Sequence, residues 1–478
     1  MTSIMGLTLA IDFGSTYTKL VAFDLTREEI VAVTQTKSTV DTDITLGLRS
    51  ALEKMYAILD KEGINIDKIF ACSSAAGGLR MVAIGLVKAL TTKAAEEAAL
   101  GAGAKLVGTY SYGLNADDIK EIEHRSPDLI LLTGGTDGGN KEVIIDNAKI
   151  LAKSRLNIPI IIAGNRMVAQ LVKSILSEAG KYAVTEENVL PELDRLKVEP
   201  TRDRIRDIFM HRITHAKGLD RAKSIVGDII MPTPMAVLNA ATLLADGTNE
   251  EEGLGELIVV DIGGATTDIH SVAHGYPTNS SVVFKGLPEP YRKRTVEGDL
   301  GIRYNAKTIL EKVGKEKLMK RMALLNDTLP SNIELEKRVE YLSNHIDAIP
   351  QIEEDSLIDL ALASVALDIA MQRHVGTIKE TYLPCGTTRI QYGKDLTNIR
   401  LIIGTGGIFS YGDKPYFILK WACYNKSNPE SLRPIAPELL VDERYILFAI
   451  GLLADISKTG ALRIMKRYLK KCNSGLML

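Results

Sequence analysis

The sequence predicts an α/β protein with two or more domains. At 478 residues the chain is longer than one hydrophobic core usually supports, and its 45% hydrophobic residues are enough for several cores. A strand that runs into an acid, glycines and hydroxyl residues occurs twice, as LAIDFGSTYTKLVAF from Leu9 to Phe23 and as VDIGGATTDI from Val260 to Ile269. Between these motifs, short apolar strands alternate with helical stretches, which is typical of a parallel sheet.

The net charge and the spacing of the cysteines exclude several classes of function. With 58 basic and 60 acidic side chains the net charge is -2, so we expect neither nucleic acid nor a membrane as partner. No basic signal region is seen at the N-terminus, and no apolar run reaches the roughly 20 residues of a membrane span. The four cysteines stand far apart without a C-x-x-C pair, which favours reduced thiols and a cytoplasmic location. These cysteines are Cys72, Cys385, Cys423 and Cys472.

The N-terminal region is predicted to form a small sheet covered by one helix. Leu7 to Phe23 reads as strand, glycine turn and strand, and Ile30 to Thr34 as a third strand. Apolar residues from Leu48 to Leu59 recur at helical spacing, so an amphipathic helix is expected over Thr45 to Asp60. Lys68 to Cys72 is expected to return as a strand.

The next region predicts an inserted, doubly wound α/β domain. Its strands are expected at Lys105 to Thr109, Leu129 to Thr133 and Ile158 to Ala163. Its helices are expected at Asp117 to His124, Val143 to Ser154 and Met167 to Gly180. Short loops between alternating strands and helices indicate parallel pairing. Arg202 to Lys223 carries both charge signs and is predicted to be a solvated helical linker. The expected domain ranges are 1–71, 72–231 for the insert with its linker, and 232–478.

Both glycine motifs have the composition of a phosphate-binding turn. Gly14, Gly263 and Gly264 would let the backbone approach a ligand closely, so that amides and hydroxyls bond phosphate oxygens. Asp12 and Asp261 stand at strand ends, where they could hold a hydrated magnesium ion through water, and Lys19 could neutralise phosphate charge. Either motif alone is better explained as an ordinary hairpin. Their joint occurrence favours a phosphate clamp.

Two further glycine-rich segments follow strands. LIIGTGGIFSY, from Leu401 to Tyr411, ends a strand with glycines against which a purine and ribose could lie. TGGTDGGN, from Thr133 to Asn140, either cradles a second ligand at a helix start or only shapes a crossing loop at the sheet edge. Asp137 is the residue that would separate these two interpretations.

The order of these motifs resembles the ATPase superfamily of actin, the sugar kinases and the heat-shock chaperones. The first phosphate loop resembles DFGSTYTK, the second resembles DIGGATTD, and the adenosine loop resembles GTGG. Two small-residue helices, Pro232 to Asp246 and Asp442 to Ile456, match the connecting helices, and Val296 to Ala306 matches a loop beside the nucleotide. The resemblance implies two ribonuclease-H-like, actin-like ATPase lobes around a nucleotide cleft, with ATP and Mg²⁺ as cofactors.

The resemblance also implies roles for individual residues. Asp12 and Asp261 would organise Mg²⁺ through water and orient the attacking water, and Lys19 would supply a point charge to the phosphates. The residues implied to contact phosphates are Gly14, Ser15, Thr16, Thr18, Gly263, Gly264, Thr266 and Thr267. Those implied at the rest of the nucleotide are Glu297, Gly298, Gly404, Gly406 and Gly407.

Within the superfamily the sequence is most similar to the MutL-type accessory proteins encoded beside adenosylcobalamin-dependent glutamate mutase, which are unrelated to mismatch-repair proteins of the same abbreviation. The similarity includes SSAAGGLRM at Ser73 to Met81, LILLTGGTDGGN at Leu129 to Asn140 and RTVEGDLG at Arg294 to Gly301. It implies an ATP-driven clamp that acts as a reactivating or assembly factor, with the mutase subunits as protein partners.

One departure from the superfamily predicts slow hydrolysis. In the heat-shock chaperones an acid precedes the Pro-Thr pair that opens the first connecting helix, whereas Met231 stands there in this sequence. A thioether is a poor ligand for a hydrated cation. The expected activity is therefore a slow or partner-stimulated ATPase.

Two alternative functions remain open from the sequence. A small-molecule kinase would need an acceptor pocket with a base near the γ-phosphate, and Asp261 could fill that role. An ATP-dependent activator of an acyl-CoA dehydratase would need cysteines to hold an iron–sulfur cluster, for which Cys72 and Cys385 are not convincingly placed.

Overall fold

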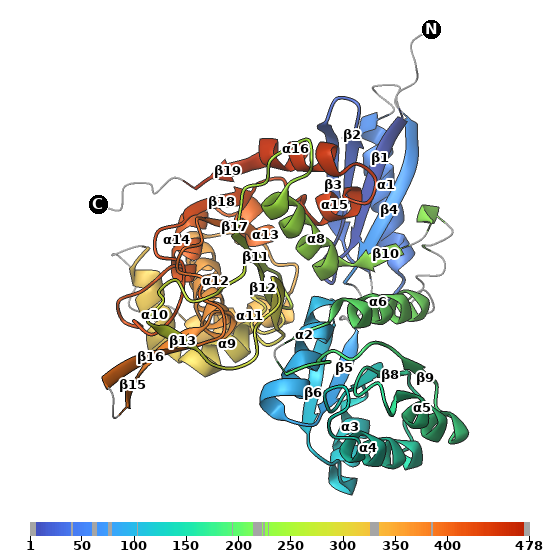
Figure 1. The fold of residues 1–478 in the computed structure, drawn as a ribbon. Helices are drawn as coiled ribbons and strands as arrows, with labels where there is room; N and C mark the ends of the chain where they lie inside the picture. Colours follow the sequence, from blue (N-terminus) through green and yellow to red (C-terminus); the bar gives the residue numbers. More distant parts are fainter. Residues whose placement is uncertain are drawn as a thin grey trace. The chain divides into compact units, whose positions relative to one another are not determined.

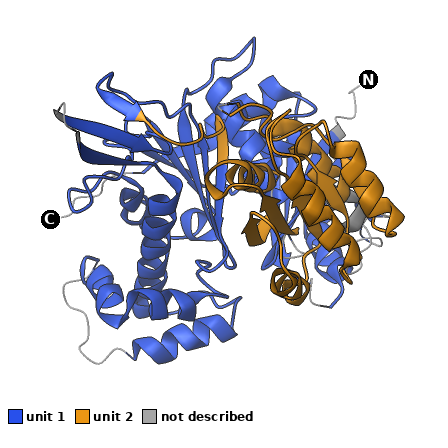
Figure 2. Ribbon diagram, turned by 60° about the horizontal axis from the view of Figure 1, so that its bottom comes forward, with its two compact units in different colours: residues 1–75, 217–283, 294–478 blue, residues 76–216, 284–293 orange. Residues whose placement is uncertain are grey.

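The computed structural model describes residues 6–39, 42–59, 65–74, 79–102, 104–193, 195–213, 222, 225–227, 229–325, 334–383 and 386–472. Over these residues the chain is an α/β protein with four sheets. It divides into two compact units (Figure 2): residues 1–75, 217–283 and 294–478 form unit 1, and residues 76–216 and 284–293 form unit 2. Within the described ranges, no helix combines the length and apolar character that crossing a bilayer requires.

The first sheet of unit 1 has the order β10-β4-β1-β2-β3. Its strands are β1 (Gly6–Phe13), β2 (Tyr17–Asp24), β3 (Glu29–Lys37), β4 (Asn65–Ser73) and β10 (Ile229–Pro232). The first three strands form an antiparallel meander, and β4 and β10 add in parallel. Helix α1 (Ile44–Leu59) packs its apolar face on β2 and β3. Strands β1 to β4 and helix α1 agree with the predicted ones to within a few residues, whereas β10 was not predicted.

The second sheet of unit 1 has the order β14-β12-β11-β17-β18-β19. Its strands are β11 (Leu257–Ile262), β12 (Thr267–Val272), β14 (Arg292–Glu297), β17 (Leu401–Thr405), β18 (Glu438–Asp442) and β19 (Leu469–Lys471). If the strands of each sheet are numbered in chain order, the first sheet has the spatial order 3-2-1-4-5 and the second has the order 3-2-1-4-5-6. In both sheets the first, fourth and fifth strands are parallel to one another. The repeated order is what the predicted pair of ribonuclease-H-like lobes requires. We call them the first lobe and the second lobe.

Helices surround the second sheet, and one of them lies inside the core. Helix α12 (Glu353–His374) is buried over most of its length, including both apolar and small residues, as expected for a helix covered on all sides. The other helices are α9 (Ala306–Val313), α10 (Lys315–Ala323), α11 (Leu335–Asn344), α13 (Gly407–Ser410), α14 (Pro415–Leu419) and the 3-10 turn η3 (Lys420–Ala422). Helix α16 (Lys458–Tyr468) instead packs against α8 (Thr233–Asp246) and α15 (Leu447–Leu453). A small sheet joins β13 (Val282–Phe284), β16 (Gly386–Tyr392) and β15 (Thr377–Leu383).

Two small-residue helices cross closely between the lobes (Figure 1). These are α8 (Thr233–Asp246) and α15 (Leu447–Leu453), which belong to the two segments expected to connect the lobes. A Cβ atom added to Gly451 would lie 1.8 Å from the carbonyl oxygen of Ala236, so the two backbones touch directly. Any side chain at Gly451 would push the helices apart.

Unit 2 contains a parallel sheet with the order β6-β5-β7-β8-β9. Its strands are β5 (Arg80–Gly85), β6 (Lys105–Ser111), β7 (Leu129–Leu132), β8 (Ile160–Ile162) and β9 (Ala183–Thr185). Its helices are the π-helix η2 (Lys88–Thr92), α2 (Lys93–Gly101), α3 (Ala116–Arg125), α4 (Glu142–Lys153), α5 (Ala169–Glu178) and α6 (Glu199–Ile213). Strand β5 was not predicted, although it lies between β6 and β7.

The expectation of a solvated charged linker is wrong for the first half of α6. Arg202 is 6% exposed, and its guanidinium donates hydrogen bonds to the carbonyl oxygens of Glu97 and Arg292. The space for this side chain exists because residue 101 is glycine, whose added Cβ would lie 2.2 Å from Nε of Arg202. Residues 214–221 and 223 of the predicted linker lie outside the described residues.

Candidate functional site

The first turn joins β1 to β2 and holds an acid opposite a base. Asp12 pairs with Lys19 across the antiparallel strands. The amide of Gly14 donates to the carbonyl of Tyr17 at 3.1 Å, and a Cβ atom on Gly14 would lie 2.5 Å from that same oxygen. Glycine is therefore required for the turn itself, and Ser15 beyond it stays partly exposed.

Both carboxylate oxygens of Asp12 have protein partners. Lys19 Nζ lies 3.2 Å from Oδ2, and Thr233 Oγ1 donates to Oδ1 at 2.6 Å. The thiol of Cys72, on the neighbouring strand β4, lies 3.7 Å from Oδ1. Asp12 is only 1% exposed, so its charge is compensated inside the protein.

Lys19 carries a stable positive charge at the base of the turn. Its Nζ lies 3.5 Å from the ring centroid of Tyr445, in cation–π geometry. Burial disfavours the ammonium form, but Tyr445 and the carboxylates of Asp12 and Asp261 outweigh that effect, and the pKa of Lys19 is raised above its ordinary value. The side chain is therefore cationic throughout the physiological range.

The second turn joins β11 to β12 and places two acids opposite each other. Asp261 pairs with Asp268 across the strands. Arg294 Nη2 lies 2.6 Å from Oδ1 of Asp268, and Thr266 Oγ1 donates to Oδ2 at 2.8 Å. Within the described part of the chain, no hydrogen bond or ion pair to the carboxylate of Asp261 is found. Asp268 is thus satisfied and Asp261 is not.

Asp261 is poised to change protonation near neutrality. Its carboxylate is partly open to solvent but is surrounded by protein atoms, and this burial raises its pKa to about 7. The nearby carboxylates of Asp268, Asp12 and Asp442 act in the same direction, and Lys19 opposes them only in part. A bound cation would relieve this repulsion.

The two turns face each other within unit 1. A Cβ atom on Gly264 would lie 3.0 Å from Oγ1 of Thr16. The hydroxyls of Thr16 and Thr18 are buried and find no hydrogen-bond partner among the described residues. Unpaired hydroxyls of this kind are the groups that phosphate oxygens could satisfy.

The second turn is buttressed by the loop that precedes α9. The amides of Ile302 and Arg303 donate to the carbonyls of Gly263 and Gly264, at 3.2 Å and 3.0 Å. Thr267 Oγ1 donates to the carbonyl of Leu300 at 2.8 Å, so this hydroxyl already has a structural partner. Of the two threonines predicted here, neither Thr266 nor Thr267 has a hydroxyl free of protein contacts.

The three glycines of the GTGG loop differ in their surroundings. Gly404 lies inside β17 under the ring of Phe409, which a Cβ atom would approach to 2.9 Å. Gly406 has a φ of 112°, and its Cβ atom would lie 2.4 Å from the carbonyl of Ile262 and 3.2 Å from Oδ1 of Asp261. Gly407 has open space where a Cβ would stand. Gly406 therefore packs the loop onto the second turn, and Gly407 leaves room for a ligand.

Glu297 and Gly298 lie at the end of β14. The carboxylate of Glu297 forms an ion pair with Arg373 of α12. Burial raises the pKa of Glu297, and Arg373 opposes that shift. The carbonyl of Gly298 accepts a hydrogen bond from Nδ2 of Asn305 at 3.2 Å. A contact of either residue with nucleotide stays a prediction.

The residues at the turns fit a magnesium ion carried with a phosphate ligand. Over the described residues, no group of three or more His, Cys, Asp or Glu side chains is placed to enclose a metal. Mg²⁺ commonly keeps several waters and uses one or two carboxylates together with substrate phosphates. The unpaired carboxylate of Asp261 beside Asp12 suits that arrangement.

Sequence reasoning did not predict which residues bond Asp12 and Asp268 or which ring contacts Lys19. Thr233, Tyr445 and Arg294 all stand in segments that the resemblance covers, but no role was assigned to them. The Pro-Thr start of α8 was the available signal for Thr233, whose hydroxyl can donate a hydrogen bond to a nearby carboxylate. Tyr445 has a φ of 55°, an unusual backbone conformation that no sequence pattern predicted.

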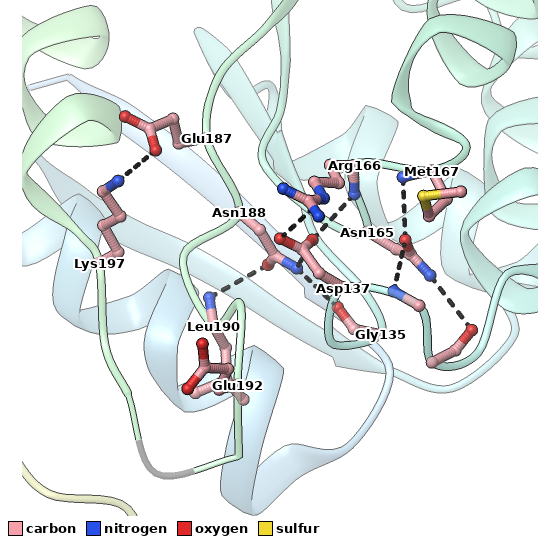
Figure 3. A network of polar contacts seen from close by, with 12 residues as sticks. Gly135, Asp137, Asn165, Arg166, Met167, Glu187, Asn188, Leu190, Glu192 and Lys197 are labelled. Atoms are coloured by element: carbon pink, nitrogen blue, oxygen red, sulfur yellow. Dashed lines mark hydrogen bonds and ion pairs between the residues drawn. The ribbon is translucent and has the colours of Figure 1, made fainter.

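Polar groups of the glycine loop TGGTDGGN form hydrogen bonds with neighbouring loops of the protein (Figure 3). Asp137 Oδ1 accepts hydrogen bonds from the amide of Arg166 and from Nδ2 of Asn188, each at 3.0 Å. Nδ2 of Asn165 donates to the carbonyls of Gly139 and Asn140. The network ties together the loops after β7, β8 and β9, which supports the interpretation as a crossing loop.

The three cysteines that the structure describes show no arrangement suited to a cluster. Cys72 is fully buried beside Asp12, and burial raises the pKa of its thiol well above the ordinary value. Burial likewise raises the pKa of Cys423 and of Cys472 to about 11. Cys385 lies outside the described residues.

Comparison with known proteins gives two extensive sequence matches. A family model described as MutL protein matches residues 8–469. Protein MutL of Clostridium tetanomorphum is 48% identical over 463 residues, which make up 97% of this chain and 99% of that relative.

Solved structures give weaker matches. Glycerol kinase of Plasmodium falciparum with ADP is 11% identical, with 98% of this chain and 94% of the kinase covered and a TM-score of 0.37. Ethanolamine utilization protein EutJ of Carboxydothermus hydrogenoformans is 10% identical, with 95% and 89% covered and a TM-score of 0.28. At these TM-scores neither structure indicates what this chain binds.

Proposed function

The chain belongs to the MutL protein family, and we propose that it is an ATP-binding protein with slow, partner-stimulated ATPase activity. In this proposal it reactivates or assembles an adenosylcobalamin-dependent mutase of the glutamate type in the cytoplasm. The mutase subunits are the partner that its resemblance to glutamate mutase accessory proteins implies.

The observation that carries the proposal is the pair of facing turns. Thr16 of the first lobe and Gly264 of the second lobe lie in direct contact range, and each turn begins at an acid. A triphosphate held by both turns would favour the closed arrangement of the lobes over an open one. Because a ligand shifts an equilibrium only by its differential affinity, contacts from both lobes are what make nucleotide an effective switch.

The charges at the turns supply what a magnesium–nucleotide complex needs. Lys19 is a buried cation for phosphate charge, and Asp261 is a carboxylate without a protein partner. When bound, Mg²⁺ would be held through water by Asp12 and Asp261, and it would neutralise developing phosphate charge. Asp261 would also orient water, since a pKa of about 7 lets it accept a proton near neutral pH.

Phosphate release from Mg-ATP tests the proposal, measured with the purified protein alone and with a purified adenosylcobalamin mutase. We expect release to rise when the mutase is added and to fall by about a hundredfold in Asp261→Ala. Asp146→Ala is the matched control, because Asp146 is an exposed acid of α4 that pairs with Lys149.

Two outcomes would count against this function. ATP binding by calorimetry without phosphate release in either condition would favour a small-molecule kinase that awaits its acceptor. Release that is unaffected by Asp261→Ala would remove the second turn from the chemistry.

A further inference from the structure

A polar pocket of about 330 Å³ opens in the second lobe, apart from the two turns. Its lining includes Lys317 of α10, Asp368, Gln372 and Arg373 of α12, and the loop from Asn425 to Arg433. Ile369 is the one apolar residue among its lining side chains. Such a lining suits a small, charged ligand better than an apolar one.

The charge of the pocket wall is positive. Arg433 is 4% exposed, and its Nη1 donates to Oδ1 of Asp368 at 2.9 Å. Arg321 is 5% exposed, and its Nη2 donates to Oδ2 of the same carboxylate at 2.7 Å. Two buried guanidinium groups therefore share one carboxylate, and Lys317 and Arg373 add further cations at the rim.

Two buried donors of lining residues lack a partner. Nε of Arg433 and Oγ of Ser431 are buried and make no hydrogen bond to any described residue. Both residues are more than nine-tenths buried and both line the pocket. A buried donor without an acceptor is costly unless water or a ligand supplies one.

We propose that this pocket binds a small oxyanion, through a phosphate or carboxylate group. Arginine and serine donors next to a positive wall are the groups that recognise such an anion. The pocket is separate from the turns: Asp359 of α12 pairs with Arg303 beside Gly264, and Asp368 lies nine residues further along, about 14 Å at the rise of an α-helix.

The pocket is linked to the second lobe's predicted nucleotide loop by one side chain. Arg373 lines the pocket and also pairs with Glu297 at the end of β14. An anion that engages Arg373 competes with Glu297 for the same guanidinium. Binding of an anion in the pocket therefore weakens the ion pair of Glu297 at the end of β14.

Calorimetric titration with inorganic phosphate and, separately, with acetate tests the proposal, with chloride at equal ionic strength as the blank. We expect saturable binding of one of the two anions, which identifies the preferred group. Lys317→Glu should weaken that binding about tenfold, because it reverses a rim charge. Lys320→Glu is the matched control: it makes the same charge change on the same helix, where Lys320 pairs with exposed Glu316.

Ser431→Ala separates ligand recognition from folding. This variant removes a buried hydroxyl that has no partner among the described residues, so the melting temperature without anion should not fall, while anion binding should weaken. Equal losses in Lys317→Glu and Lys320→Glu would show a general charge effect and overturn the proposal. Absence of saturable binding for both anions would overturn it as well.

Discussion

Each lobe has an acid at the end of the first strand of its sheet in chain order, but the two acids have different surroundings. Asp12 faces Lys19 and accepts a bond from Thr233, whereas Asp261 faces Asp268 and accepts none from the described residues. The repeated strand order thus fixes where the acids stand but not their charge environment. The acid of the first turn is compensated by protein groups, whereas the acid of the second turn would be stabilised by a cation from outside.

Exchanging each acid for its amide should change stability in opposite directions. Asp12→Asn leaves buried Lys19 without its counterion and should lower the free energy of unfolding by about 3 kcal/mol. Asp261→Asn removes carboxylate repulsion and should raise it by about 1 kcal/mol at pH 8, a figure reduced for the partial exposure of Asp261. Urea unfolding without nucleotide or magnesium measures both values. Changes of the same sign would remove the contrast between the turns.

The backbone around the second turn can be tested with two neighbouring glycines. Gly406→Ala places a methyl group 2.4 Å from the carbonyl of Ile262 at a φ of 112°, and should destabilise the fold by about 2 kcal/mol. Gly407→Ala meets open space and should leave stability within about 0.5 kcal/mol. If nucleotide lies against Gly407, that variant should still weaken ATP binding, as measured by calorimetry. Equal stability losses would contradict the different roles of the two glycines.

A carboxylate placed near Asp12 would give the first lobe two neighbouring acids, as the second lobe has. Met231 is fully buried on β10, in register with Cys72, which is in turn in register with Asp12. Met231→Glu should raise phosphate release from Mg-ATP about tenfold if a missing carboxylate limits turnover. Met231→Gln has nearly the same shape without the charge and should not. An unchanged rate in Met231→Glu would show that another step limits hydrolysis.

The pH dependence of Mg-ATP binding should come from the second turn. The pKa of Asp261 is raised from 3.8 to about 7, so the native state keeps its proton between these values while the unfolded chain releases it. Its contribution to stability is present at acidic pH and is lost as the pH rises through about 7. Magnesium must displace that proton, so affinity should rise severalfold from pH 6 to pH 8. Titrations of Asp261→Asn should show a flat profile over this range.

The sequence predicted the turns well because their signals are local. Asp12, Gly14 and Lys19 stand within eight consecutive positions, and strand, turn and strand follow from their neighbours. The order of the three glycine motifs then predicted the superfamily, and the family match agrees with the narrower resemblance.

The partners of the site residues could not be predicted in the same way. Thr233 bonds Asp12 across a separation of 221 positions, and its role depends on β10 joining the first sheet. The burial of Arg202 depends on the absence of a side chain at Gly101. Strand β5 was missed because Arg80 and Met81 were taken as the end of a motif and no element was assigned to the four residues that follow. These contacts depend on tertiary packing, which a window of sequence does not contain.

The crossing of α8 over α15 has a mechanical consequence. At Gly451 the two helices meet backbone against backbone, and no side chain of that residue interlocks with the helix opposite. Elsewhere in a packed core, rotation of one helix over another must first unlock interdigitated side chains. We therefore expect this point of the crossing to resist rotation less than a contact between interlocked side chains would.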